Sequence, residues 1–170
     1  MLIDHDSLPT TMSAEPAPKI RVAELFAGVG GFRLGLEGDD YEFVFSNQWE
    51  PGSKRQWASR LYAGRFGEEG HEGCDIHEFT KTVEATFQIP EIDLLVGGFP
   101  CQDYSVARTK SGELGIDGDK GKLWMPIWQI IRRSHLNQTQ HRPKVILLEN
   151  VPRLLNSPAT ARGLNFSVIL

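Results

Sequence analysis

A cysteine and a glutamate are the residues best placed to do chemistry, because each lies at or shortly after the end of a short apolar run. Cys101 ends the sequence Gly-Gly-Phe-Pro-Cys after the run Ile92–Val96, and Glu149 follows Val145–Leu148. A thiol is roughly a few per cent thiolate at neutral pH but is strongly nucleophilic. A carboxyl group among apolar neighbours has a raised pKa and can donate a proton. If both runs are strands of one sheet, the pattern predicts a nucleophile and an acid at one edge of that sheet.

Each of these residues also has an ordinary structural explanation. A lone cysteine is usually a small buried hydrophobe, which is our interpretation of Cys74. The glycines and the proline before Cys101 bend the chain and argue against a packed interior there. Glu149 on its own fits a strand-end acid that faces water. The functional interpretation therefore rests on the pair rather than on either residue alone.

The elements that must position this pair alternate between strands and helices. Five strands are predicted, four of them apolar runs typical of strands buried on both faces of a parallel sheet. They are Ile20–Phe26, Glu42–Ser46, Ile92–Val96, Val145–Glu149 and Phe166–Leu170. Predicted helices lie at Gly31–Glu37, Pro51–Tyr62, Thr80–Phe87, Lys122–His135 and from Ser157 to Gly163. This alternation predicts an α/β fold with a Rossmann-like, doubly wound and mainly parallel sheet over residues 19–170, after a disordered leader over residues 1–18.

The first predicted strand runs directly into a glycine-rich turn, Ala-Gly-Val-Gly-Gly at 27–31, and then into a helix. At such a turn the backbone can approach a ligand closely, and the helix N-terminus favours negative charge. A dinucleotide site needs Gly or Ala where this chain has Arg33, which disfavours a nicotinamide-dependent oxidoreductase. A carboxylate about 20 positions farther on is the usual ribose ligand. In this chain Gln48 lies 20 positions after Gly28 and Glu50 lies 22 positions after it. A tight turn without a ligand is the alternative.

Three motifs together resemble those of the cytosine-5 DNA methyltransferases: Phe-Ala-Gly-Val-Gly-Gly at 26–31, Gly-Phe-Pro-Cys-Gln at 98–102 and Glu-Asn-Val at 149–151. The resemblance covers residues 19–170 and implies a domain that uses S-adenosyl-L-methionine to methylate a cytosine flipped out of double-stranded DNA. By position, Cys101 would attack C6 of the base, while Glu149 would hold the exocyclic amine and protonate N3. C5 would then take the methyl group and lose its proton as the thiolate leaves. Covalent addition fits the chemistry, because an unactivated aromatic carbon needs it before it can attack a methyl group.

The resemblance also implies a set of cofactor-binding residues. They are Phe26, Gly28, Gly30, Gln48, Trp49, Asp75 and Leu123. The first three match the family's cofactor turn, and Asp75 matches the acid that meets the adenine amine. Gln48 stands where the family usually has an acid for the ribose hydroxyls, although an amide can also hydrogen-bond a diol. Asn150 is expected to be structural and to buttress the loop that carries Cys101.

Composition narrows the class of protein. The chain has 170 residues, with 18 Lys and Arg against 22 Asp and Glu, and its formal net charge is -4. No global basic field points to nucleic acid, so DNA binding would need a local patch or a further segment. Two cysteines outside any metal-ligand spacing predict no metal site and a reducing, cytoplasmic location. No apolar run approaches the ~20 residues of a membrane span, which predicts no association with a membrane.

The family has a second half, whose motifs we do not find in this sequence. There is no Gln-x-Arg-x-Arg motif, and we expect the target-recognition domain to be absent. The apolar end Phe166–Leu170 suggests a truncated gene, one subunit of a split enzyme or a fragment prepared for crystallisation. We therefore expect the catalytic part of a DNA cytosine-5 methyltransferase of a restriction–modification system, with a second polypeptide able to supply the missing half. The alternatives are a family fragment without activity of its own and an RNA cytosine methyltransferase, although Pro100, Gln102 and Ser105 fit the DNA branch better.

Overall fold

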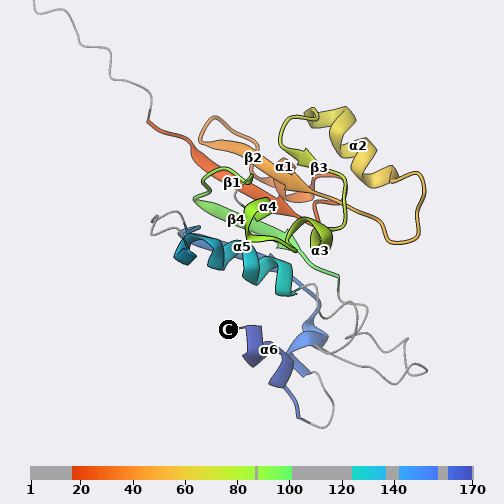
Figure 1. Cartoon of the computed structure of the whole chain (residues 1–170), viewed down its shortest axis with the longest axis vertical. Coiled ribbons are helices and arrows are strands. Elements are labelled where there is room, and N and C mark those ends of the chain that lie inside the picture. Colours follow the sequence, from red (N-terminus) through yellow and green to blue (C-terminus); the bar gives the residue numbers. More distant parts are fainter. Residues whose placement is uncertain (1–16, 87, 101–123, 137–141, 157–160, 170) are drawn as a thin grey trace, which may run out of the picture.

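A five-stranded parallel sheet is the centre of the protein (Figure 1). The computed structural model describes residues 17–86, 88–100, 124–136, 142–156 and 161–169. The strands are β1 (Ile20–Leu25), β2 (Tyr41–Asn47), β3 (His71–Glu72), β4 (Leu94–Gly98) and β5 (Val145–Glu149), in the order β3-β2-β1-β4-β5. The strand order reverses between β1 and β4, as in a doubly wound Rossmann-like fold. The predicted fold class is confirmed.

Helices pack on both faces of this sheet. They are α1 (Gly31–Gly35), α2 (Trp57–Phe66), α3 (Ile76–Phe79), α4 (Val83–Thr86), α5 (Trp124–Leu136) and α6 (Leu164–Ile169), together with a 3-10 helix at Pro152–Asn156. On one face Ile127 and Ile130 of α5 pack with Leu25 and Leu95 in the main core, and each is at most 1% exposed. On the other face α2 brings Tyr62 against β1. The carboxyl ends of the strands are therefore framed by helices from both layers.

A β-bulge in β2 determines which face of the sheet its side chains occupy. Ala23 of β1 pairs with Phe45 rather than with Val44, so Val44 is an extra residue in the ladder. As a result Phe45 joins the main core, and Ser46 lies beside Glu24. Such a bulge bends the strand locally and changes which face the following side chains reach.

The predicted segments are mostly present with shifted ends. β5 has the predicted bounds, whereas the two-residue strand β3 has no pattern that sequence could reveal. α2 begins at Trp57 rather than at Pro51, because the loop before it is held by Gln56, whose Nε2 donates to the Glu50 carbonyl at 2.8 Å. Gln56 itself has a φ of 46°, which is outside the helical range.

The predicted strand at Phe166–Leu170 is wrong, because Phe166 to Ile169 belong to the helix α6. Its hydrogen bonds are local: the Ser167 N–H donates to the Gly163 carbonyl at 2.9 Å, and the Ser167 hydroxyl donates to the Leu164 carbonyl at 2.7 Å. Phe166 and Ile169 pack against the main core from this helix. A short apolar run fits a buried strand and a packed helix equally well, which is why sequence did not separate them. The leader (1–16) and most of the predicted helix from Ser157 lie outside the described residues.

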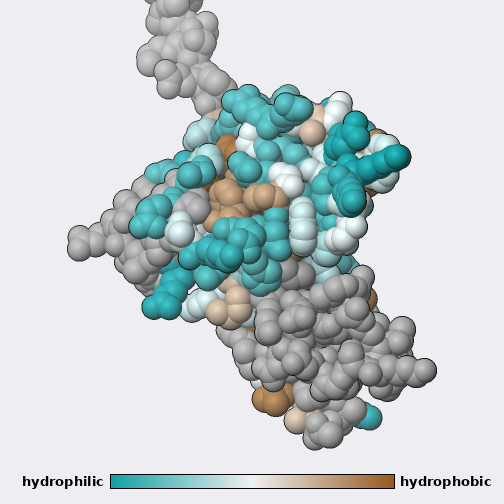
Figure 2. Space-filling view, turned by 45° about the vertical axis from the view of Figure 1, so that its right-hand side comes forward, coloured by the Kyte–Doolittle hydropathy of each residue, from teal (hydrophilic) through white to brown (hydrophobic). Residues whose placement is uncertain are grey.

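Burial of β5 on both faces was also expected and is not found. Val145, Ile146 and Leu147 are all exposed, whereas Val22 of β1 and Leu95 of β4 are fully buried. Figure 2 shows an apolar patch within a mostly hydrophilic surface. Among the described residues, no helix is both long enough and apolar enough to cross a membrane.

Candidate active site at the carboxyl edge of the sheet

The turn after β1 opens the candidate site. Phe26 has a φ of 55° although it carries a side chain, and Gly28 and Gly30 have φ values of 57° and 93°. A side chain at position 30 would put its Cβ 2.3 Å from the Phe66 ring of α2, so only glycine fits there. A Cβ at position 28 would meet nothing within 4 Å, so the backbone of Gly28 borders open space. The turn is thus anchored at one glycine and accessible at the other.

Gln48 reaches this turn from the end of β2. The Gly28 N–H donates to Gln48 Oε1 at 2.8 Å, so the side chain predicted from its spacing does lie beside the predicted glycine. The adjacent backbone is fixed too, because the Ala27 N–H donates to the Asn47 carbonyl at 3.0 Å. Trp49 follows with 37% of its surface exposed. The structure therefore brings together the predicted residues of the first two strand ends.

Asn47 is a residue that the sequence analysis missed. It is 1% exposed, and its Nδ2 donates to the carbonyls of Glu72 and Cys74, each at 2.9 Å. These two bonds tie the end of β2 to the segment that leads into Asp75. The amide is a donor to two acceptors here, so a carboxylate at the same position would meet two carbonyl oxygens without a proton to share. No local sequence pattern indicates this role, because both acceptors lie at least 25 residues away in the chain.

The side chains of Asp75 and Glu50 each accept a hydrogen bond from a backbone N–H group at the start of a helix. Asp75 Oδ1 accepts the His77 N–H at 2.9 Å as the N-cap of α3, and its Oδ2 has no hydrogen bond among the described residues. Glu50 Oε2 accepts the Ala58 N–H at 2.9 Å in the first turn of α2. Side-chain oxygens commonly satisfy the free N–H groups at helix starts. The carboxylate of Glu50 is therefore held at the first turn of α2 by this hydrogen bond.

A buried polar network underlies the glycine turn. Glu24 is fully buried and accepts a hydrogen bond from the Tyr62 hydroxyl at 2.9 Å. The Tyr62 ring stacks on His71, whose two ring nitrogens lie 2.8 Å from the Ser46 hydroxyl and 2.9 Å from the Ser59 hydroxyl. Burial raises the pKa values of Glu24 and Tyr62 and lowers the pKa of His71. All three shifts favour uncharged side chains between the sheet and α2.

Arg33 closes this network on the side of α1. Its Nη1 donates to the Tyr62 hydroxyl at 3.3 Å, and its guanidinium lies 4.7 Å from the ring centre of Phe66 and 5.0 Å from that of Phe43. Arg33, which disfavours a dinucleotide site in the sequence, is therefore a packing residue between α1, α2 and β2. A cation over aromatic faces contributes roughly 0.5–2 kcal/mol per contact.

The ends of β4 and β5 carry the predicted chemistry. These strands pair in parallel with Gly98 opposite Glu149. Glu149 at the end of β5 therefore lies beside the end of β4, from which the chain continues to Cys101. Asn150 Nδ2 donates to the Phe99 carbonyl at 3.0 Å, and Asn150 Oδ1 accepts the Val151 N–H at 2.8 Å. Asn150 thus braces the turn after β4, as expected. The burial expected for Glu149 is not found, because its side chain is exposed, and Cys101 and Leu123 lie outside the described residues.

Cys74 differs from the other cysteine in its setting. It is half-buried and free, and burial raises the pKa of its thiol, with the nearby Glu72 acting in the same direction. A thiol with a raised pKa is a poorer source of thiolate. Cys74 was expected to be a small buried hydrophobe, but it is only half-buried and does not belong to the main core.

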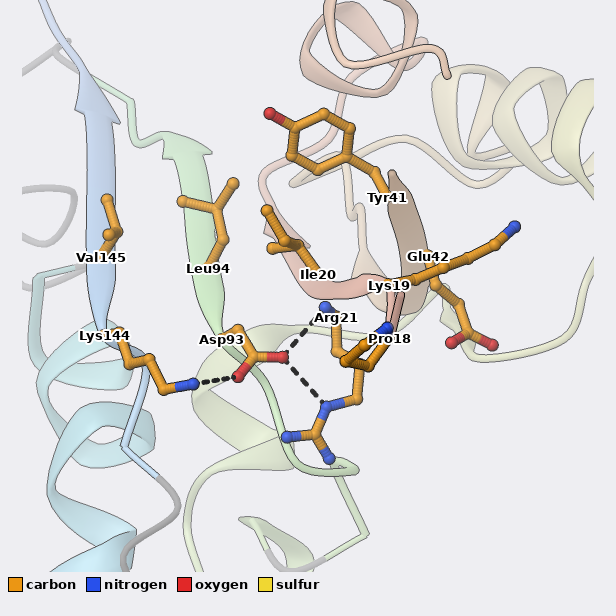
Figure 3. A pocket seen from close by; sticks show the side chains of 10 residues that line it. All are labelled: Pro18, Lys19, Ile20, Arg21, Tyr41, Glu42, Asp93, Leu94, Lys144 and Val145. Carbon is orange, nitrogen blue, oxygen red and sulfur yellow. Dashed lines mark hydrogen bonds and ion pairs between the residues drawn. The ribbon is translucent and has the colours of Figure 1, made fainter. Parts of the chain in front are cut away.

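The opposite, amino edge of the sheet holds an ion-pair cluster (Figure 3). Asp93 accepts hydrogen bonds from Arg21 Nε and from the Arg21 N–H, both at 3.1 Å, and from Lys144 Nζ at 3.1 Å. Arg21 also pairs with Glu91 at 2.6 Å. These hydrogen bonds hold the pKa of Asp93 well below its ordinary value of 3.8. Across the described residues, no group of three His, Cys, Asp or Glu side chains is arranged to hold a metal ion.

Comparison with known proteins identifies relatives of one kind. Residues 20–170 match the family described as C-5 cytosine-specific DNA methylase. The chain is 51% identical over 155 residues to type II methyltransferase M.Sau3AI of Staphylococcus aureus, covering 89% of this chain and 35% of the relative. It is 37% identical over 132 residues to type II methyltransferase M.HhaI of Haemophilus parahaemolyticus, covering 78% and 34%. The chain therefore spans about a third of the length of these relatives.

A solved structure supports the fold. It is described as a DNA modification methyltransferase encoded within an E. coli prophage. The TM-score is 0.57 at 23% sequence identity, and the alignment covers 82% of this chain and 34% of that one. At this level of identity the likeness supports the Rossmann-like architecture alone.

Proposed function

The chain belongs to the C-5 cytosine-specific DNA methylase family, and on that premise we propose that it is the catalytic and cofactor-binding part of a DNA cytosine-5 methyltransferase of a type II restriction–modification system. The observation that carries the proposal is the pairing of β4 with β5, because it sets Glu149 opposite Gly98, three residues before Cys101. The glycine turn after β1 lies at the same edge of the sheet. Ligands of open α/β sheets bind at this edge, near the point where the strand order reverses.

The residues around the glycine turn fit S-adenosyl-L-methionine. Gly28 borders open space, which leaves room for a ligand against the backbone. Phe26 and Gly30 shape the turn, with Trp49 nearby, and Asp75 has one carboxylate oxygen available for the adenine amine. When bound, the cofactor supplies an electrophilic methyl group. Leu123, outside the described residues, completes the proposed set.

Gln48 has a proposed role that differs from that of an acid. Its Oε1 already accepts the Gly28 N–H, and its Nε2 donates to the Trp49 carbonyl at 3.4 Å, which leaves the second N–H of Nε2 to donate to a ribose. A carboxylate could accept from both hydroxyls of the diol, whereas the amide has one N–H left for them while the other is bonded to the Trp49 carbonyl. Gln48 therefore contributes to the shape of the turn as much as to the contact with the ribose.

Two residues carry the proposed reaction on a flipped cytosine. The Cys101 thiolate forms a bond to C6 while Glu149 gives its proton to N3, which makes C5 nucleophilic enough to accept a methyl group. Loss of the proton from C5 restores the ring double bond and expels the thiolate from C6. Asn150 keeps the turn after β4 in place through the Phe99 carbonyl. The partner is double-stranded DNA, and a second polypeptide is proposed to supply the target-reading half.

A covalent-trapping experiment tests this function. The chain is mixed with duplex DNA that contains 5-fluorocytosine, with S-adenosyl-L-methionine and with a polypeptide corresponding to the remaining length of the S. aureus relative. We expect a protein–DNA adduct, because fluorine at C5 prevents release of the thiolate. Cys101→Ala should abolish the adduct and Cys74→Ala should leave it, since each removes one of the two thiols in the chain. An adduct that survives Cys101→Ala, or one that forms only with an RNA duplex, contradicts the proposal.

A further inference from the structure

We infer that Asn47 is a positioning residue for the cofactor. Its buried side-chain amide holds the chain just before Asp75 and thereby sets the preference of the site for a base that carries the adenine amine. The inference rests on the proposed function, because it concerns the same S-adenosyl-L-methionine site. It adds a residue that acts without touching the cofactor, and it names the part of the cofactor that this residue controls.

Asn47 lies where three segments of the site meet. Its carbonyl accepts the Ala27 N–H at 3.0 Å, which joins it to the glycine turn after β1. Gln48 follows it in the chain, and the Gln48 N–H donates to the Glu72 carbonyl at 3.1 Å. The side chain of Asn47 is too deeply buried to reach a ligand, since the residue is 1% exposed. Asn47 can therefore influence the site only through the segments that it contacts.

The side chain of Asn47 takes over where the backbone ladder between β2 and β3 ends. The last pair of that ladder is Asn47 with Glu72. Beyond it, Asn47 Nδ2 donates to the carbonyls of Glu72 and Cys74, each at 2.9 Å. An amide nitrogen carries two N–H groups, so both are used here. The amide thus holds the chain for two residues past the sheet, up to the residue that precedes Asp75.

Asp75 is anchored on both sides, which makes its position sensitive to Asn47. On the side before it lies the Cys74 carbonyl that Asn47 holds. On the side after it Ile76 is 3% exposed and belongs to the main core. Asp75 Oδ1 accepts the His77 N–H at 2.9 Å, which leaves Oδ2 for the adenine amine. If the amide were lost, the core would still hold Ile76, so we expect a local shift of the carboxylate rather than unfolding.

The base of the cofactor reports on this shift. A carboxylate oxygen accepts a hydrogen bond from the amine of adenine, whereas hypoxanthine presents a carbonyl oxygen at the same position. A site built to hydrogen-bond one group discriminates strongly against an analogue that leaves its polar atoms unpaired. This discrimination requires the correct distance and angle at the acceptor. The ratio of the two affinities therefore measures where the Asp75 carboxylate lies, while a general loss of stability weakens the binding of both compounds.

Calorimetric titration tests the role of Asn47. The full chain, mixed with the polypeptide used for covalent trapping, is titrated with S-adenosyl-homocysteine and with S-inosyl-homocysteine. The wild type should prefer the adenine compound by at least ~10-fold, the effect of a hydrogen bond to a charged group, and Asn47→Ala should reduce this preference to below ~3-fold. Asn47→Asp should reduce it as well, because a carboxylate would face two carbonyl oxygens. Asp93→Asn is the matched control, since it removes hydrogen bonds at the opposite edge of the sheet and should leave the ratio unchanged.

Two further measurements separate positioning from a loss of structure. In an Asp75→Asn background, Asn47→Ala should leave the ratio as it is, because the amide acts through Asp75. Asn47→Ser keeps a donor that is too short to reach both carbonyls, and it replaces Asn47→Ala if circular dichroism shows that variant to be unfolded. In the wild type, the nuclear magnetic resonance signals of the Asn47 side-chain amide should shift with S-adenosyl-homocysteine and shift less with the inosine compound.

The outcomes distinguish this inference from the proposed function. The inference is overturned if the wild type shows no preference for adenine, if the ratio survives the loss of the Asn47 amide, if Asp93→Asn lowers it equally, or if the effects of Asn47→Ala and Asp75→Asn add. The expected ratios without a DNA adduct support the role of Asn47 and contradict the proposed function. An adduct in a protein whose ratio ignores Asn47 supports the function and contradicts the role of Asn47.

Discussion

The inner half of the sheet (β2 and β1) and its outer half (β4 and β5) contain similar apolar residues, but the outermost strand β5 is buried far less. Val22 in β1 is fully buried between helices, whereas Val145 in β5 is 57% exposed in a run of similar composition. The inner half carries helices on both faces and a hydrogen-bonded network under the glycine turn. An apolar side chain is more stable when it is buried, but its burial depends on whether another element packs against it.

The largest effect is expected from Gly30→Ala, which acts on the inner half. The new Cβ would lie 2.3 Å from the Phe66 ring in a backbone of φ 93°, so overpacking and left-handed strain add up to roughly 3 kcal/mol of lost unfolding free energy. Urea unfolding followed by circular dichroism measures this loss. Gly64→Ala is the control, because its Cβ would meet nothing within 4 Å in the helix α2, where alanine is favoured by about 0.5–1 kcal/mol. Equal losses in both variants would contradict the proposed packing.

Tyr62→Phe should cost about 2 kcal/mol at pH 7, because the buried Glu24 carboxylate loses its hydrogen-bond donor. Burial already raises the pKa of Glu24 above its ordinary value of 4.5, so the stability it contributes is present below pH 4.5 and is lost as the pH rises through the folded pKa. Loss of the donor raises this pKa further. The cost measured by urea unfolding should therefore be larger at pH 7 than at pH 4. In a Glu24→Gln background this pH dependence should disappear.

Asp93→Asn acts where the two halves meet, because Asp93 accepts hydrogen bonds from Arg21 of β1 and from Lys144 just before β5. We expect a loss of about 1 kcal/mol at pH 7, since the pairs are partly exposed to solvent. A lowered pKa means that this stability is present above pH 3.8 and is lost as the pH falls toward the folded pKa. The difference from the wild type should therefore shrink in thermal or urea unfolding below about pH 4. A difference that stays constant down to pH 2 would contradict the assignment.

The smallest effect is expected in the outer half. Val145→Thr should change the unfolding free energy by less than about 0.5 kcal/mol, because the hydroxyl stays in water. Val22→Thr places the same group in the core and should cost about 2 kcal/mol. Paired urea titrations of the two variants compare the halves directly. Similar values for both would mean that β5 is covered in solution by part of the chain itself.

Some parts of the site could be predicted and others could not. The spacing between Gly28 and Gln48 indicated two strand ends at one edge, and the hydrogen bond between them confirms their proximity. Asn47 and Glu24 escaped notice because their partners lie 25 to 38 residues away and follow no local period. The expected burial of β5 was wrong for a related reason, since an apolar run does not reveal whether another segment covers it.

The extra residue in β2 has a consequence for how this region can vary. The deletion of Val44 alone would leave Phe45 directly after Phe43, so Ala23 would still pair with Phe45 and Glu24 with Ser46. The ladder would then be regular, and Phe45 would stay on the face of the main core. A one-residue deletion after the bulge, by contrast, would shift the register and exchange the faces of the side chains that follow. The bulge is therefore the point at which the length of β2 can change with the least effect on the core, the polar network and the glycine turn.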